Sequence, residues 1–133
     1  FGGNTPPNPA LISVFPSLAY DSFVTIGRAT DVDNAMLEIG IDWTSFEAGG
    51  SISTDNGSWF ATPDDAQVYE VDGRVLIGQF TTTGDIDGMI NIQGKNADLS
   101  NWQYRGVEFS SVPAPGALAL LGLAGFAARR RRT

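Results

Sequence analysis

Apolar and polar residues alternate in short stretches along most of this chain, and that alternation predicts β-strands rather than helices. It is clear in residues 36–43, 89–94 and 102–109, where apolar side chains recur at about every second position. Residues 22–29 carry apolar groups on both sides, so we expect a strand that is buried on both faces or bent across a sheet edge. No segment of residues 11–110 has the period of an amphipathic helix. The pattern therefore predicts an all-β domain.

Turn-forming residues separate the predicted strands. The pair Asp72-Gly73 stands between residues 68–71 and 74–82, and because both residues tolerate positive φ, it predicts a type I′ hairpin. Residues 74–82 carry apolar side chains on both faces and are the best candidate for a central strand. Further turns are expected by composition at residues 31–34, 85–88 and 96–100. About seven strands with turns every eight to twelve residues predict an antiparallel β-sandwich, of which a jelly roll is one form.

Composition divides the chain into three parts. Residues 1–10 are rich in glycine and proline and are expected to form a flexible lead-in. Residues 11–110 form the predicted β domain, whose first apolar run, residues 11–15, we interpret as a short edge strand or the lead into one, stopped by Pro16. Residues 111–133 differ from both, because they contain no acidic residue and end in a basic cluster.

The C-terminal part combines a proline-punctuated segment, an apolar run and four arginines, in that order. The first segment consists of Val112, Pro113, Ala114 and Pro115. The apolar run predicts one short transmembrane helix, made of Gly116, Ala117, Leu118, Ala119, Leu120, Leu121, Gly122, Leu123, Ala124, Gly125, Phe126, Ala127 and Ala128. The positive-inside rule places the following cluster in the cytoplasm as a stop, with Arg129, Arg130, Arg131 and Arg132. Such a helix rises only ~20 Å, short of the ~30 Å hydrocarbon core, so we expect a temporary anchor.

This order of parts resembles the PEP-CTERM sorting signal of bacteria that make extracellular polysaccharide. In that family a Val-Pro-Glu-Pro-like motif precedes a weak transmembrane helix and an arginine cluster, and Ala114 stands where the family usually has glutamate. The resemblance implies that a membrane enzyme of the exosortase type cuts near the motif and releases or transfers the body to the cell exterior. Because sorting requires export, a signal peptide is expected ahead of Phe1. A buried C-terminal helix is the alternative, and the terminal arginines argue against it.

The body of the chain is strongly acidic. Four of the eight basic residues lie in the C-terminal cluster, so residues 1–110 carry four basic and fifteen acidic side chains, a net charge of −11. Such a surface repels nucleic acid, and it repels anionic polysaccharide unless divalent cations intervene. The chain contains no cysteine and no histidine, which excludes a disulfide framework and the catalytic triads that use histidine.

Two acidic turns are candidate calcium sites. Asp31 and Asp33, and separately Asp85 and Asp87, place carboxylates at alternate positions where they could converge on Ca²⁺. Neither turn completes an EF-hand loop, and aspartate also favours turns for its own hydrogen bonding. A plain turn is the favoured interpretation of each pair, and calcium is the one cofactor that the sequence leaves open.

Trp43, Trp59 and Trp102 are candidate stacking residues for a sugar ring. Aromatic residues in strands more often pack in cores or across strands, and we favour core packing for most of them. The many carboxylates would also allow a pair suited to glycoside hydrolysis.

The sequence predicts a non-enzymatic adhesion or structural protein of the bacterial surface or extracellular matrix. Its body would lie outside the cytoplasmic membrane, held briefly by the tail until the exosortase-type enzyme acts. A carbohydrate-binding module for extracellular polysaccharide is the first alternative, and a small polysaccharide-acting hydrolase is the second.

Overall fold

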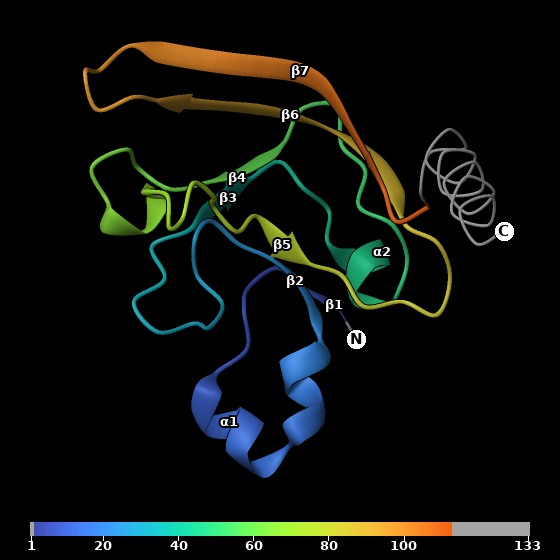
Figure 1. Ribbon diagram of the computed structural model, residues 1–133. Helices are drawn as coiled ribbons and strands as arrows, with labels where there is room; N and C mark the ends of the chain where they lie inside the picture. Colours follow the sequence, from blue (N-terminus) through green and yellow to red (C-terminus); the bar gives the residue numbers. More distant parts are fainter. Residues whose placement is uncertain (1, 113–133) are drawn as a thin grey trace, which may run out of the picture. The chain divides into compact units, whose positions relative to one another are not determined.

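The computed structural model describes residues 2–112 of the chain (Figure 1). The chain forms two compact units, unit 1 (Phe1–Thr81) and unit 2 (Thr82–Thr133). The boundary between the units falls inside residues 11–110, the range that the sequence predicts as one domain. Residues 113–133, with most of the predicted sorting motif, the membrane helix and the arginine cluster, lie outside the described residues. Within residues 2–112, no helix has the length and apolar character needed to cross a bilayer.

Short strands dominate the described part of the chain, which confirms the prediction of a β-rich fold. The strands are β1 (Gly2–Gly3), β2 (Ser22–Val24), β3 (Leu37–Ile39), β4 (Ser58–Phe60), β5 (Gly78–Gln79), β6 (Asp87–Lys95) and β7 (Asn101–Ser110). The helices are α1 (Pro9–Val14) and α2 (Thr44–Glu47), with the 3₁₀ helices η1 (Pro16–Tyr20) and η2 (Ala66–Val68). The strands form small sheets that are mainly antiparallel, while the face-to-face stacking of a sandwich stays a prediction.

Strand β2 is the centre of the three-stranded sheet of unit 1. It pairs in parallel with β1 and antiparallel with β5, where Phe23 lies opposite Gln79. Strands β3 and β4 form a separate antiparallel pair with Glu38 opposite Trp59. The prediction of a central strand at residues 74–82 is wrong, because β5 is short and lies at the sheet edge. Strand β2 takes the centre because Phe23 and Val24 are fully buried there.

The hydrophobic core of unit 1 forms around Val24, Trp43 and Phe46. The rings of Trp43 and Phe46 lie 6.1 Å apart, a tilted packing that suits aromatic side chains. Partly buried residues complete the cluster, namely Met36, Ile41, Ile52 and Trp59. Complete burial of one such side chain contributes roughly 1.5–3 kcal/mol, so this cluster and the buried Phe23 stabilise unit 1.

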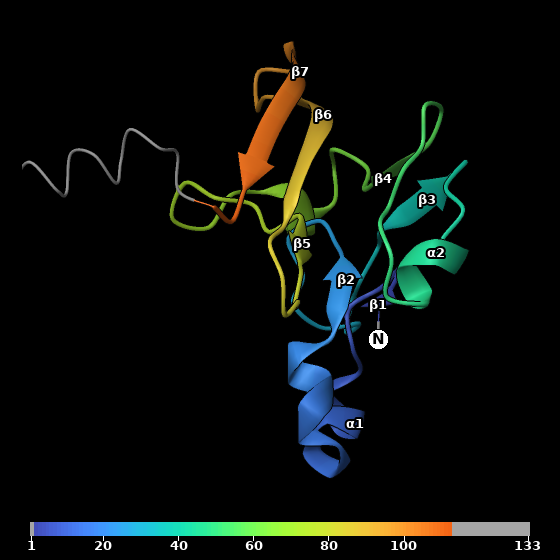
Figure 2. The same cartoon turned by 90° about the vertical axis from the view of Figure 1, so that its right-hand side faces the viewer.

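Residues 11–15, predicted as an edge strand, instead belong largely to helix α1. The side chain of Asn8 accepts a hydrogen bond from the Ala10 N–H at 2.8 Å, and Pro9 occupies the first turn. An asparagine cap followed by proline is a strong helix start, and it outweighs a short apolar run. Helix α1 and η1 lie beside each other and project from the sheet of unit 1 (Figure 2).

A buried amide, Gln67, ties η2 to the loop that follows β2. Its Nε2 donates to the Ile26 carbonyl at 2.9 Å, and its Oε1 accepts from the Ala35 N–H at 2.8 Å. Its own N–H donates to the Asp65 side chain, which caps η2. Gly27 has a φ of +71°, and a Cβ there would overlap the Gln67 carbonyl oxygen. The loop can approach η2 this closely only with glycine at position 27.

The segment predicted as a flexible lead-in is built into unit 1. Gly2 and Gly3 form β1, Pro6 is buried, and the Pro7 carbonyl accepts from the Asp31 N–H at 3.2 Å. Backbone pairing therefore gives this glycine- and proline-rich segment a defined place that side-chain periodicity did not indicate.

The predicted Asp72-Gly73 turn is confirmed. Asp72 and Gly73 have φ values of +53° and +74°, as a type I′ turn requires. Val71 and Arg74 exchange both backbone hydrogen bonds, at 2.9 and 3.1 Å. The strands expected on either side do not extend from it, since the ladder consists of this single bridge.

Candidate functional site

The antiparallel ribbon of β6 and β7 is the longest regular structure in the described chain (Figure 1). Its pairing runs from Asp87 opposite Ser110 to Lys95 opposite Asn101. Strands at residues 89–94 and 102–109 were predicted from alternation, and the structure confirms both and extends them. We call this pair of strands the ribbon.

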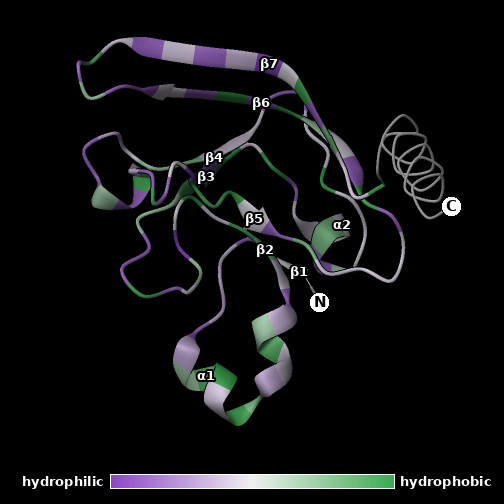
Figure 3. Cartoon of the chain, in the orientation of Figure 1, coloured by the Kyte–Doolittle hydropathy of each residue, from purple (hydrophilic) through white to green (hydrophobic). Residues whose placement is uncertain are grey.

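The ribbon has one apolar and one polar face, because successive side chains of a strand point to opposite sides. The apolar face carries Gly88, Ile90, Ile92 and Gly94 from β6 and Trp102, Tyr104, Val107 and Phe109 from β7. The polar face carries Asp87, Met89, Asn91, Gln93 and Lys95 from β6 and Asn101, Gln103, Arg105, Glu108 and Ser110 from β7. The alternation is visible along β7 in Figure 3.

Aromatic rings from β7 lie directly over the two glycines of β6. A Cβ built on Gly88 would lie 2.6 Å from Cζ of Phe109, and one built on Gly94 would lie 2.5 Å from Cζ2 of Trp102. The Trp102 ring also packs against Tyr104, with ring centroids 6.0 Å apart. Glycine leaves the space that each ring fills, so a larger residue at either position would displace the ring.

A β-bulge interrupts β7 but not β6. Ile90 lies opposite Val107 and Ile92 lies opposite Tyr104, so two residues of β7, Arg105 and Gly106, face the single residue Asn91. The Asn91 side chain accepts from the Gly106 N–H at 2.9 Å. The extra residue therefore bends and twists β7, while the outer edge of β6 stays regular.

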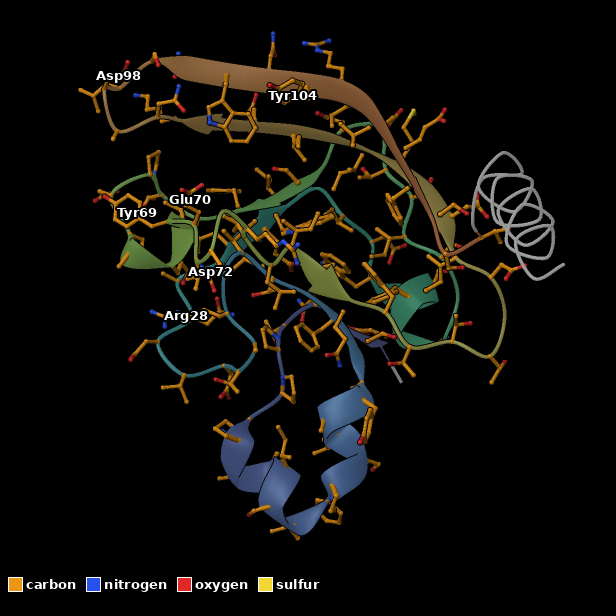
Figure 4. The ribbon with its side chains drawn as sticks, in the orientation of Figure 1. Arg28, Tyr69, Glu70, Asp72, Asp98 and Tyr104 are labelled. Carbon is orange, nitrogen blue, oxygen red and sulfur yellow. The ribbon has the colours of Figure 1, made fainter. Side chains whose placement is uncertain are left out.

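Hydrogen bonds organise the loop that joins the two strands. Asp98 accepts from both the hydroxyl and the N–H of Ser100, and these bonds, the hydroxyl first, lower the pKa of the Asp98 carboxyl. The Asn96 side chain donates to the Ser100 hydroxyl at 2.9 Å. Figure 4 shows Asp98 at this loop and Tyr104 on β7. The predicted turn at residues 96–100 is thus confirmed, and it sets the register of the ribbon.

The apolar face of the ribbon is only partly covered: Ile90, Ile92 and Trp102 are half-buried, and the remaining large side chains of β7 are exposed. Tyr104 is 63% exposed and Phe109 is 43% exposed, and no residue between 82 and 112 is buried. In the described chain β6 pairs with β7 alone, so each strand has an unpaired edge. Such a surface can recruit another strand or an apolar partner.

Neither of the two aspartate pairs considered as a calcium site belongs to a larger cluster of acidic side chains in residues 2–112. Asp31 and Asp33 are exposed in unit 1, and Asp85 and Asp87 are exposed in unit 2. The Asn34 N–H donates to the Asp31 carbonyl at 3.3 Å, which closes a plain turn. Across residues 2–112, no group of three or more acidic side chains is placed to hold a metal.

The three tryptophans occupy different environments. Trp43 is 7% exposed in the core, where no sugar ring can reach it. Trp59 packs against Trp43 with ring centroids 6.5 Å apart, and its Nε1 donates to the Thr25 carbonyl. Trp102 lies in unit 2 on the apolar face of the ribbon. The structure therefore brings Trp43 and Trp59 together as core residues.

A small cavity of about 210 Å³ opens in unit 1 beside the Asp72-Gly73 turn. Its lining consists of Gly27, Tyr69, Val71, Arg74, Val75 and Leu76. One cation and no carboxylate line it, so it does not supply the two carboxylates that glycoside hydrolysis uses.

No protein-family model matches the chain, and neither a search of curated proteins nor a search of solved structures finds a match. The ribbon is therefore the feature from which function is argued. Sequence reasoning identified its strands but missed the importance of Gly88, Gly94 and Asn91. Gly88 and Gly94 stand on the same face of β6 as Ile90 and Ile92, and this was a signal in the sequence. The contact of Asn91 with Gly106 depends on the register of the two strands, which the sequence does not give.

Proposed function

We propose that the protein is exported and acts outside the cytoplasmic membrane as a non-enzymatic surface or matrix component, with the ribbon as its contact surface. The observation that carries the proposal is the ribbon's display of aromatic and aliphatic side chains beside unpaired strand edges. Adhesion and assembly need such a surface and need no catalytic group. The antiparallel sandwich expected for the body remains part of this proposal, supported by the small antiparallel sheets.

The position of the ribbon supports processing at the C-terminal motif. Strand β7 ends at Ser110, and the last backbone bond of the ribbon runs from the Ser111 N–H to the Ile86 carbonyl at 2.7 Å. The motif begins at the next residue, Val112, which is 48% exposed. A cut within residues 112–115 would leave both strands of the ribbon intact in the released body.

Sorting is tested by expressing the chain behind a cleavable signal peptide in a bacterium that has an exosortase. We expect the body at the cell exterior with a new C-terminus near residues 112–115, measured by intact mass. Replacing Arg129, Arg130, Arg131 and Arg132 with glutamine should abolish that cut, while the matched change Arg105→Gln outside the tail should leave it unchanged. A body that keeps Thr133 in the wild-type strain would refute the sorting proposal.

Polysaccharide binding is a second candidate function, favoured by the Trp102–Tyr104 ring pair on one strand face. Neighbouring aromatic rings can stack on sugar rings, and Tyr104 is largely exposed. Thermal unfolding with a panel of soluble polysaccharides tests it, since a ligand of the folded state raises the Tm. Trp102→Ala should remove the shift and Trp59→Phe should keep it. The absence of a shift with any polysaccharide would count against this function.

A further inference from the structure

The sequence of β6 is nearly symmetric about its middle residue. Its nine residues, from Asp87 to Lys95, read Asp-Gly-Met-Ile-Asn-Ile-Gln-Gly-Lys, with Asn91 at the centre. On the two sides of Asn91, glycine matches glycine, isoleucine matches isoleucine, and methionine matches glutamine of similar length. The two ends carry opposite charges. A strand of this kind complements a second copy of itself when the two run antiparallel, because each residue then meets its counterpart.

Hydrogen bonds at the two ends of the ribbon show which backbone groups of β6 point away from β7. The Ser111 N–H donates to the Ile86 carbonyl at 2.7 Å, and the Asn96 N–H donates to the Ser100 carbonyl at 2.9 Å. Bonded and non-bonded pairs alternate in an antiparallel ladder, so even-numbered residues of β6 bond to β7. The bonds at both ends of the ribbon give this same assignment, because the extra residue of the bulge lies in β7 and leaves the alternation along β6 unchanged. The outward N–H and C=O groups belong to Asp87, Met89, Asn91, Gln93 and Lys95.

A two-fold axis through Asn91 uses these outward groups. Antiparallel pairing about that axis places Met89 opposite Gln93 of the second copy, and Asp87 opposite Lys95 of the second copy. Only odd-numbered residues then meet as hydrogen-bonded pairs, so the outward donors and acceptors match. Each pairing creates two contacts between opposite charges, one at each end of the strand.

The same axis continues the apolar face across four strands. Ile90 then lies beside Ile92 of the second copy, and Gly88 lies beside Gly94 of the second copy. Since Phe109 covers Gly88 and Trp102 covers Gly94, a row of ring, glycine, glycine and ring crosses the new sheet. A two-stranded ribbon alone is marginally stable in water, whereas three or more strands with an apolar face are stable.

The opposite edge, on β7, is poorly suited to strand pairing. The bulge at Arg105 and Gly106 interrupts its backbone ladder, and bulges are a common protection of sheet edges. Lys95 and Asp87 could by themselves protect β6, since charged residues often block edge pairing. Here the two charges are opposite and lie at equal distances from Asn91. Antiparallel association therefore brings Asp87 of one copy next to Lys95 of the other, which favours pairing.

We propose that the protein self-associates as a two-fold dimer by antiparallel β6–β6 pairing centred on Asn91, which makes a four-stranded sheet. The inference rests on the proposed role of the ribbon as a contact surface and not on export. Its partner is a second copy of this chain.

Site-specific crosslinking tests the register, and the absence of native cysteine makes each thiol unambiguous. Two single variants of the full chain, Met89→Cys and Gln93→Cys, are kept in mild detergent and treated with a short thiol crosslinker. An equimolar mixture should give a crosslinked dimer, because positions 89 and 93 meet across the axis. Each variant alone should give little dimer, since its two thiols would be separated by four residues along the strands, about 14 Å.

Other crosslinking patterns would overturn the proposal. Efficient dimer from each variant alone indicates parallel, in-register pairing. Equal yields from all three samples indicate association through another part of the chain. The absence of dimer from the mixture, in variants whose circular dichroism matches the wild type, indicates that this edge does not pair.

Charge exchange provides an independent test by sedimentation equilibrium. Lys95→Glu places two acidic residues together at both ends of the pairing, so the dimer Kd should rise on the order of tenfold. The double variant Asp87→Lys with Lys95→Asp should restore the wild-type Kd, while Arg105→Glu on the polar face of β7 serves as the charge-matched control. If Lys95→Glu leaves the Kd unchanged, the end charges do not face each other and the proposed register is wrong. Sorting and polysaccharide assays read different properties, so failure of the dimer leaves those proposals standing.

Discussion

Unit 1 and unit 2 are stabilised in different ways. In unit 1, Phe23, Val24 and Trp43 are buried, and the Gln67 amide joins two loops through hydrogen bonds. Within the described part of unit 2 no side chain is buried, and the ribbon relies on its ladder, bulge and loop. A core stabilises a fold from within, whereas a ribbon with an exposed apolar face gains stability from what covers it. The contrast supports the proposal that unit 2 provides the contact surface.

The largest expected effect is the loss of the Phe23 side chain from the core. Phe23→Ala should lower the free energy of unfolding by about 4 kcal/mol, because it leaves a cavity beneath the central strand. Urea unfolding followed by circular dichroism measures this change. Phe15→Ala is the matched control, since Phe15 is 57% exposed, and its effect should be within about 0.5 kcal/mol. Equal effects of the two changes would contradict the position of the core.

Removal of the Gln67 amide should have the next largest effect. Gln67→Ala leaves the Ile26 carbonyl and the Ala35 N–H without these partners in a buried site, at a cost of about 2 kcal/mol. The same unfolding experiment applies, with the exposed Gln103→Ala on β7 as its control. If unit 1 keeps its stability without Gln67, the network does not hold the loop after β2.

The connecting loop offers a stabilising change that is confined to unit 2. Leu99 has a φ of +68° and is 73% exposed, so its side chain adds backbone strain without burial. Leu99→Gly should stabilise the ribbon by about 0.5–1 kcal/mol, measured by amide exchange of β6 and β7. Leu37→Gly in β3, where φ is not positive, should destabilise unit 1 instead. Stabilisation by both changes would contradict the strain at Leu99.

Acidic pH should produce the smallest effect. Hydrogen bonds from Ser100 lower the pKa of Asp98, and those from Thr44 lower the pKa of Asp42 in unit 1. Because each folded-state pKa lies below the ordinary value of 3.8, this stabilisation is complete above that pH and is lost as the pH falls through the folded pKa. Asp98→Ala should remove the response of the loop amides only, and Asp42→Ala that of the amides around Thr44. NMR titration from pH 5 to about 2 measures both, and responses that ignore the site of substitution would contradict this assignment.

Local signals in the sequence determined the ribbon, its connecting loop and the separate Asp72-Gly73 turn of unit 1. Alternation in residues 89–94 and 102–109 defines two faces wherever the strands lie, and Asp72-Gly73 specifies its turn through backbone preferences alone. The near-symmetry of β6 is likewise written in the sequence. The sequence also contains the helix-start signal of Asn8 and Pro9, but the apolar run of residues 11–15 that follows it predicts a strand instead of helix α1.

Tertiary structure alone decided the remaining assignments. Alternation does not show which strand is central. Strand β2, and not residues 74–82, holds that position, because Val24 of β2 packs with Trp43 and Phe46 in the core. The same packing made core residues of Trp43 and Trp59 and left Trp102 on the ribbon. Within residues 2–112 neither acidic turn gains the further ligands that a metal site needs, because convergence of side chains in space is not encoded by their spacing in the chain. Burial and convergence depend on contacts between distant residues, whereas strand faces and turns depend on neighbours.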